Sequence, residues 1–179
     1  IEYEGLDTLL RAVAVLRDQS VACKLNIAGD GEARPALQAI VSELSLENQV
    51  RFLGRLSPAD ARQMVAQAAV VCIPRKPYEV CKIVPPIKLV EAMAMAKPVV
   101  VPDLPVFRDE LGADSPGLFF RSGDVLDLAR VLTETLAKPE EMRALGLRAR
   151  TYVEQNRSWE PHVLNVLDTM HRLTSKKQG

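Results

Sequence analysis

The sequence predicts an α/β domain: a Rossmann-like parallel β-sheet with helices on both faces and a helical C-terminus. Three observations support this fold class. Short apolar segments alternate with longer segments of helical periodicity through most of the chain. The segments at residues 70–73 and 99–101 are continuously apolar, which is typical of strands buried on both faces. Residues 126–173 then hold helical patterns only.

The first part of the chain alternates helix and strand. Its predicted elements are a helix at 5–17, a strand at 24–28, a helix from Pro35, a strand at 50–53 and a helix at 58–69. Leu6, Leu9 and Val13 give the first helix an apolar stripe. Ser57 is a predicted N-cap, because a proline follows it at the first helical position.

The second part begins with two strands that flank a basic loop and a short helix. Its predicted elements are strands at 70–73, 99–101 and 117–120 and helices at 87–95, 126–137, 140–155 and 159–173. Pro86 suits the start of the short helix, and Pro98 ends it. The polar tail at 174–179 is expected to be frayed.

Composition narrows the class of protein. Hydrophobic residues make up 47% of the 179 residues, enough for one domain over residues 1–179. Lys plus Arg and Asp plus Glu number 23 each, which argues against a nucleic-acid or anionic-membrane partner. The chain begins in a helix, so we expect a fragment that lacks the first strand of its own sheet. The absence of a signal-peptide pattern predicts a cytoplasmic protein.

Three loops follow predicted strands and therefore meet at one edge of the sheet, where parallel sheets bind ligands. They contain Gly29-Asp30-Gly31, Gly54-Arg55 and the basic segment 75–88. The first loop fails as a dinucleotide fingerprint, because Arg34 stands where the third glycine would fall. That departure argues against an oxidoreductase domain. No cluster of His, Cys or Asp suggests a metal site.

Lys88 lies in the first turn of a predicted helix, where free amides and the helix dipole already place positive charge. Arg75, Lys76 and Lys82 precede it. Cations that converge on a helix start are typical of a phosphate site. The alternative is an ordinary surface pair between Lys88 and Glu91, and the sequence leaves both interpretations open.

Taken together, these segments resemble the C-terminal domain of retaining GT-B glycosyltransferases, the family-four, group-one enzymes, particularly bacterial exopolysaccharide-type members. The most specific motif is E-A-M-A followed by K-P-V-V. The matching segments cover nearly the whole chain in the order of the family, at residues 3–13, 25–40, 50–57, 88–112, 117–132 and 148–160.

The resemblance implies one half of a GT-B fold that binds a nucleoside-diphosphate sugar without a metal. Lys88 and Arg75 would hold the diphosphate, and Glu91 would bind the ribose hydroxyls. Gly54-Arg55 would lie near the nucleobase. The residues implied in donor binding are Gly29, Asp30, Gly31, Gly54, Arg55, Pro86, Ile87, Lys88, Leu89 and Glu91.

The sequence departs from the family pattern at three places, one of which is Pro85-Pro86 in place of the usual Phe-Gly before the helix. Ile83 occupies the position of a glutamate that contacts the donor sugar, and Glu79 is the candidate replacement, which makes Lys88, Arg75 and Glu79 the predicted catalytic set. Glu4-Gly5 replaces Lys-Gly and so removes one phosphate-binding lysine. These departures leave a second hypothesis, a catalytically degenerate nucleotide-binding module of the same fold.

The resemblance also implies a missing N-terminal acceptor domain. We therefore expect sugar transfer to a polysaccharide or glycolipid acceptor, with retention, only in a longer polypeptide, and no turnover by this fragment alone. Association with the inner face of a membrane would depend on the absent domain.

Overall fold

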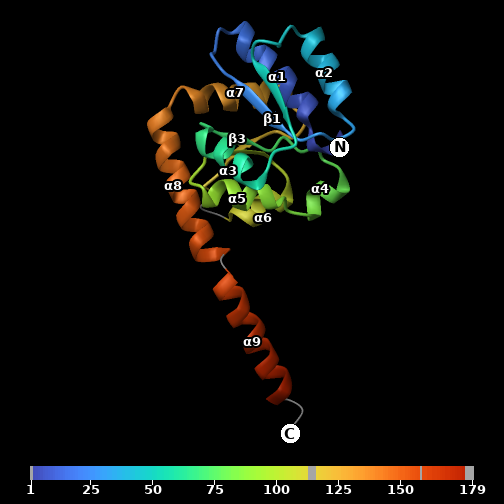
Figure 1. Cartoon of the computed structure of the whole chain (residues 1–179). Coiled ribbons are helices and arrows are strands. Elements are labelled where there is room, and N and C mark those ends of the chain that lie inside the picture. Colours follow the sequence, from blue (N-terminus) through green and yellow to red (C-terminus); the bar gives the residue numbers. More distant parts are fainter. Residues whose placement is uncertain (1, 113–115, 158, 176–179) are drawn as a thin grey trace.

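The structure is a computed structural model and describes residues 2–112, 116–157 and 159–175 (Figure 1). Its elements are η1 (Glu2–Glu4), α1 (Leu6–Asp18), β1 (Leu25–Ala28), α2 (Arg34–Glu43), β2 (Val50–Gly54), α3 (Pro58–Gln67), β3 (Val71–Cys72), α4 (Glu79–Ile83), α5 (Ile87–Ala94), β4 (Val99–Pro102), α6 (Pro105–Leu111), β5 (Leu118–Phe120), α7 (Val125–Leu136), α8 (Pro139–Asn156) and α9 (Trp159–Ser175). Every predicted helix and strand is present, with ends displaced by a few residues.

The helix starts follow the local signals in the sequence. The Ser57 hydroxyl accepts a hydrogen bond from the Asp60 amide at 3.1 Å and caps α3, as predicted. Asp124 caps α7 in the same way through the Asp127 amide. The predicted frayed tail is partly wrong, because α9 continues to Ser175. Residues 176–179 of that tail lie outside the described residues.

Two short helices were not predicted. α4 has five residues and α6 has seven, fewer than two full turns each. Helices of this length show too little of the 3.6-residue period to be recognised from apolar spacing. Pro105 at the first position of α6 was an available signal, since proline is favoured there.

All strand pairs are parallel, as predicted, but the strands form two sheets. β1 pairs with β2, with Leu25 opposite Val50. The order of the other sheet is β3-β4-β5, with Val71 opposite Val99. Among the described residues no strand joins β1 to β3, so the single continuous sheet that we expected is divided at this point.

Helices cover both faces of the sheets, and a separate core forms on each face. Residues of α1, α2 and α7 build one core, to which β4 contributes Val100. Residues of α5, α6 and α8 build the other, to which β4 contributes Val99 and Val101. The whole of β4 is buried, which confirms the prediction of a strand covered on both faces.

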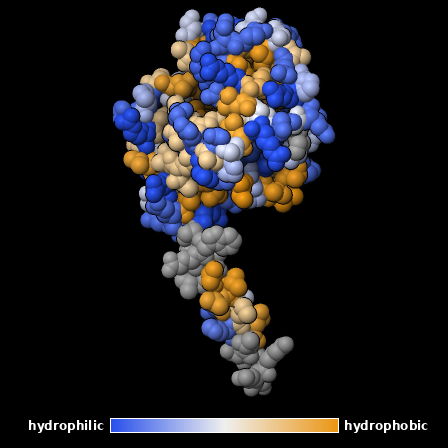
Figure 2. All heavy atoms as spheres, viewed as in Figure 1, coloured by the Kyte–Doolittle hydropathy of each residue, from blue (hydrophilic) through white to orange (hydrophobic). Residues whose placement is uncertain are grey.

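The last helix extends away from the body of the molecule (Figure 1). Apolar side chains are exposed on the described part of α9 (Figure 2), among them Val163, Val166, Leu167, Met170 and Leu173. None of the helices in the described ranges has the length and apolar character needed to cross a bilayer.

Candidate functional site

The loops that follow β1 and β2 are joined at the carboxyl edge of their sheet. The Gly29 amide donates a hydrogen bond of 2.7 Å to the Gly54 carbonyl. Gly29 has φ of 129°, a backbone conformation that side-chain-bearing residues rarely adopt. A Cβ atom added there would meet nothing within 4 Å, so the turn leaves open space above its backbone. The two predicted glycine turns therefore form one surface.

The loop after β3 is held against the start of the chain. The Lys76 amide donates a hydrogen bond of 2.9 Å to the Tyr3 carbonyl. A Cβ atom on Gly5 would lie 1.9 Å from the carbonyl oxygen of Pro74, so only glycine allows this approach. Glu4 is thereby fixed at the sheet edge, next to the basic segment.

Glu4 bridges the two predicted phosphate-binding cations. Its Oε2 accepts a short hydrogen bond from Lys88 Nζ, and its Oε1 lies 3.3 Å from Arg75 Nη2. The Lys88–Glu91 pair considered from the sequence is absent among the described residues, and Glu91 is exposed without a side-chain partner there. The structure thus brings Lys88 and Arg75 together, around a carboxylate.

The two cations are not equally available to a ligand. The Arg75 guanidinium is buried, donates to the Val84 carbonyl at 2.9 Å and lies 5.8 Å from the centre of the Tyr3 ring. The Lys88 side chain keeps 49% of its surface exposed. Arg75 therefore serves chiefly to hold the loop, and Lys88 is the cation that a ligand could reach.

The first turn of α5, which carries Lys88, also has free backbone amides. Pro86 is the N-cap residue, and no side chain caps the helix. The amides of Ile87 and Lys88 are therefore donors without an intrahelical partner. Pro86 and Leu89 are buried and anchor the turn, while Ile87 is 77% exposed. Pro86 and Leu89, both predicted to bind the donor, therefore hold the turn in place and do not offer a side chain to a ligand.

Glu79 lies in α4 and forms an ion pair of 2.6 Å with Lys82. Its side chain is 83% exposed. Ile83, at the position of the missing glutamate, is 73% exposed at the end of the same helix. The ion pair keeps the Glu79 carboxylate on the α4 surface, and among the described residues it forms no ion pair with Lys88 or Arg75.

Arg34 is a candidate that sequence reasoning missed. Its guanidinium lies 6.0 Å from the centre of the Phe52 ring and close to Gly54. Among the described residues Arg34 and the predicted Arg55 form no ion pair, and Asp30 and Arg55 are exposed. The available signal was the position of Arg34, in the first turn of the helix after the Gly29–Gly31 turn.

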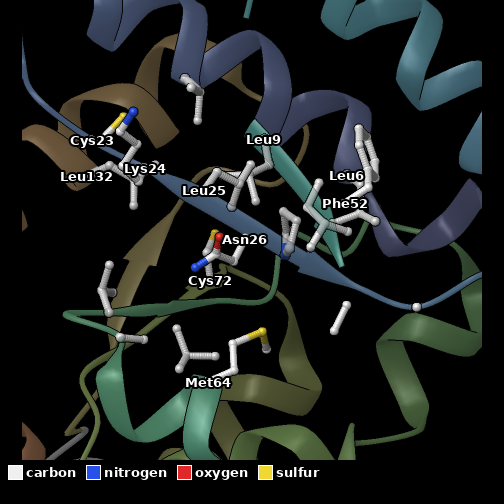
Figure 3. A pocket seen from close by; sticks show the side chains of 18 of the residues that line it. Leu6, Leu9, Cys23, Lys24, Leu25, Asn26, Phe52, Met64, Cys72 and Leu132 are labelled. Atoms are coloured by element: carbon white, nitrogen blue, oxygen red, sulfur yellow. The ribbon is translucent and has the colours of Figure 1, made fainter. Parts of the chain in front are cut away.

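A cleft of about 730 Å³ opens at this edge (Figure 3). Gly29, Gly31, Arg34, Glu4 and Lys88 line it at the carboxyl edge. Its inner part is apolar and passes between the two sheets, where the lining includes Leu9, Leu25, Met64 and Cys72.

Chemically, the cleft offers anion-binding groups at its mouth. Burial raises the pKa of the Cys72 thiol to about 12, so this thiol stays protonated near neutral pH. Within the described ranges no three His, Cys, Asp or Glu side chains are placed to hold a metal ion. The arrangement suits binding of a phosphorylated ligand.

Comparison with known proteins is consistent with this geometry. The sequence profile of the family described as glycosyl transferases group 1 matches residues 1–152. The chain is 29% identical over 161 residues to an MMP alpha-(1->4)-mannosyltransferase of Mycolicibacterium hassiacum, covering 89% of this chain and 38% of that protein. It is 28% identical over 177 residues to a GDP-mannose-dependent monoacylated alpha-(1-6)-phosphatidylinositol monomannoside mannosyltransferase of Corynebacterium glutamicum, covering 96% of this chain and 46% of that protein.

Solved structures agree at the level of the fold. The Anabaena HepE protein in complex with UDP-glucose superposes with a TM-score of 0.79 at 21% identity, covering 96% of this chain and 46% of that one. The chain thus spans less than half the length of each of these three proteins.

Proposed function

Because this chain belongs to the glycosyl transferases group 1 family and has the GT-B Rossmann-like fold, we propose that it is the donor-binding domain of a glycosyltransferase. Its ligand in this proposal is a nucleoside-diphosphate sugar. The names of its relatives support this donor class, since one is described as GDP-mannose-dependent and another was solved with UDP-glucose.

The observation that carries the proposal is that Gly29, Gly31 and Lys88, which lies in the uncapped first turn of α5, line one end of the cleft together. A diphosphate needs cations and N–H donors within reach of its oxygens. Lys88 supplies the exposed cation, and the bare backbone of the glycine turn supplies close approach.

The remaining residues take roles that follow from their positions. Glu91 lies one turn after Lys88 on α5, and its exposed carboxylate forms no hydrogen bond or ion pair within the described part of the chain. We assign it to the ribose hydroxyls. Gly54-Arg55 would face the nucleobase, and Arg34 adds a second cation that we place near the phosphates.

In the transfer step, the bond between the sugar C1 and the diphosphate oxygen breaks while C1 gains a bond to an acceptor oxygen. Negative charge develops on the departing diphosphate, and Lys88 with the α5 amides would stabilise it. In this proposal Lys88 and the α5 amides take the place of a metal ion. Retention, which the family resemblance implies, requires the acceptor hydroxyl to attack C1 on the face that the diphosphate leaves and to pass its proton to the departing diphosphate oxygen. The acceptor groups would come from polypeptide outside this chain, so the chain alone binds donor without turnover.

Calorimetric titration of the chain with UDP, GDP, ADP and NAD tests the proposal. We expect one nucleoside diphosphate to bind selectively. Binding of NAD in preference to every nucleoside diphosphate would overturn the donor assignment.

A second function, a nucleotide-binding module that has lost transfer, is favoured by two observations. Glu4 already pairs with Lys88 and Arg75 and offsets one of their two positive charges. Ile83 also removes a carboxylate from the sugar side. An assay of a longer polypeptide that includes this chain distinguishes the two functions. Measurable sugar transfer supports the enzyme, and diphosphate binding without sugar transfer supports the nucleotide-binding module.

A further inference from the structure

An exposed apolar surface lies beside Lys88, on the connection from α4 to α5. Ile83, Val84 and Pro85 are three successive exposed apolar residues, and Ile87 follows them in the first turn of α5. Figure 2 shows apolar side chains gathered at the lower right of the body, where α4 lies in Figure 1. These four residues form the α4–α5 surface. An uninterrupted exposed apolar run is typical of a surface that contacts another molecule.

Hydrogen bonds hold the α4–α5 surface next to the proposed phosphate site. The Arg75 guanidinium donates to the Val84 carbonyl at 2.9 Å and to the Glu4 carboxylate at 3.3 Å. The same carboxylate accepts a hydrogen bond from Lys88. Two prolines follow Val84, and their fixed φ angles pre-organise the connection. A group attached to a phosphate on Lys88 therefore has this surface within reach.

The order of the loops along the carboxyl edge indicates which part of a donor would meet the α4–α5 surface. Gly54 is hydrogen-bonded to Gly29, and Gly29 and Gly31 line the cleft together with Lys88. In the proposed function, on which this inference rests, the nucleobase lies near Gly54 and the diphosphate at Lys88. The sugar is attached to the far end of the diphosphate. It would therefore lie beyond Lys88, on the α4–α5 surface.

The carboxylates nearest to this surface are committed to other partners. Glu79 pairs with Lys82 at 2.6 Å. Glu4 pairs with Lys88 and Arg75. The α4–α5 surface therefore offers a ligand methyl and methylene groups and no carboxylate. Sugar hydroxyls that leave water for such a surface lose hydrogen bonds without replacement, whereas a sugar edge without hydroxyls avoids this loss.

We propose that the α4–α5 surface selects a donor whose sugar is a 6-deoxyhexose. Such a sugar carries a methyl group on C5 in place of the hydroxymethyl group of a hexose. Its edge from C1 through the ring oxygen to the methyl group has no hydroxyl, so this edge packs on Ile83 and Ile87 while the diphosphate stays on Lys88. In a hexose the same edge carries the 6-hydroxyl, which loses its water against the isoleucines.

Matched donor pairs test the proposal by isothermal titration of the 179-residue chain. GDP-mannose is compared with GDP-6-deoxymannose, UDP-glucose with UDP-6-deoxyglucose and ADP-glucose with ADP-6-deoxyglucose, so that each pair differs by one hydroxyl. Free GDP, UDP and ADP show which nucleotide the chain accepts. For that nucleotide we expect the deoxy donor to bind roughly threefold to tenfold more tightly. An enclosed apolar pocket rejects an added hydroxyl by about a hundredfold, and exposure of the sugar to water on one side reduces this discrimination.

Substitutions show whether the preference comes from the α4–α5 surface. Ile83→Ser and Ile87→Ser should each bring the ratio of the two dissociation constants closer to one, because each places a hydroxyl beside the sugar. Leu147→Ser is the matched control, since Leu147 is an exposed apolar residue of α8. This control should keep the wild-type ratio.

Binding of a nucleoside diphosphate without tighter binding of its deoxy donor would overturn the sugar assignment and leave the donor-site proposal standing. A preference that stays unchanged in both serine variants would overturn the role of the α4–α5 surface. A preference that follows protein concentration would assign this surface to a second copy of the chain and would also overturn it. If no nucleoside diphosphate binds, the proposed function fails and this inference fails with it.

Discussion

The Glu4 carboxylate accepts a hydrogen bond from Lys88, which lies 84 residues further along the chain, and the same carboxylate pairs with Arg75. The cationic end of the cleft therefore contains an internal anion. Any phosphate that binds Lys88 must displace Glu4 or share the cation with it.

Removing this internal anion should strengthen phosphate binding. For Glu4→Gln we expect roughly tenfold tighter binding of a nucleoside diphosphate, because Lys88 no longer loses an ion pair on binding. Isothermal titration measures the change. The matched control is Asp7→Asn, which removes the carboxylate paired with Lys76 at 2.8 Å and leaves Lys88 untouched. Unchanged or weaker binding by Glu4→Gln would show that Glu4 does not compete with the ligand.

Lys88→Ala should weaken nucleoside diphosphate binding by about 1.5–3 kcal/mol and nucleoside binding much less, since its proposed partner is a phosphate. Lys82→Ala is the control, because Lys82 pairs with Glu79 on the surface of α4. Equal losses for both ligands would exclude Lys88 as the phosphate-binding residue.

Glu91→Ala should lose about 1–3 kcal/mol of affinity for the diphosphate through its ribose hydrogen bonds. Comparing UDP with its 2′,3′-dideoxy analogue isolates these bonds, and Glu43→Ala, an exposed helical glutamate of α2, is the control. If the variant loses as much affinity for the analogue as for UDP, Glu91 does not bind the ribose.

Gly146→Ala should lower the free energy of unfolding by about 1–3 kcal/mol through overpacking. A Cβ atom there would lie 2.1 Å from the carbonyl oxygen of Ala96, so α8 would have to move away from the turn after α5. The sign of this change in the free energy of unfolding distinguishes the two cases, because Gly→Ala in an unobstructed helix stabilises the protein by about 1 kcal/mol. Chemical denaturation measures it, and a gain in stability would contradict the close contact.

Asp127 should make stability fall at acidic pH. Hydrogen bonds from the Arg121 amide at 2.7 Å and from Arg130 lower the pKa of Asp127 below its usual value. A carboxylate whose pKa is lower in the folded state stabilises the folded state, and this stabilisation is complete at pH values above its unfolded pKa, near 3.9. The stabilisation is lost as the pH falls through the pKa of the folded state. The free energy of unfolding, measured by denaturation from pH 6 to pH 2, should therefore depend less on pH in Asp127→Asn than in the wild-type chain. A wild-type pH dependence in the variant would refute the assignment.

The fold was largely predictable because its signals are local. The run at 99–101 and the Ser57-Pro58 helix start each depend on neighbouring residues only. The ion pairs of Glu4 were not predictable, since they depend on how residues 3–5 lie against the loop after β3. The burial of Arg75 was missed for the same reason, because no neighbouring sequence signal shows that Arg75 is buried and Lys88 is exposed.

The division of the strands into two sheets could not be predicted from the sequence pattern either. Periodicity identifies strands but not which edges meet. The roles assigned to Lys88, Glu91 and Gly54-Arg55 stay predictions until a ligand is titrated. Arg34 shows what the motif search overlooked: it was read as a failed glycine position, and the structure gives it a place at the cleft mouth.

Gly5 and Glu4 are adjacent, yet selection would treat them differently. Position 5 is closed to every side chain by the Pro74 carbonyl, whereas position 4 ends in a partly exposed carboxylate. A glutamate codon becomes a lysine codon by a single G-to-A transition. One mutational step therefore reverses the charge beside Lys88 while the neighbouring glycine preserves the backbone. The same step would leave the buried Arg75 guanidinium without its carboxylate, so greater anion affinity at this edge comes with a loss of folding stability.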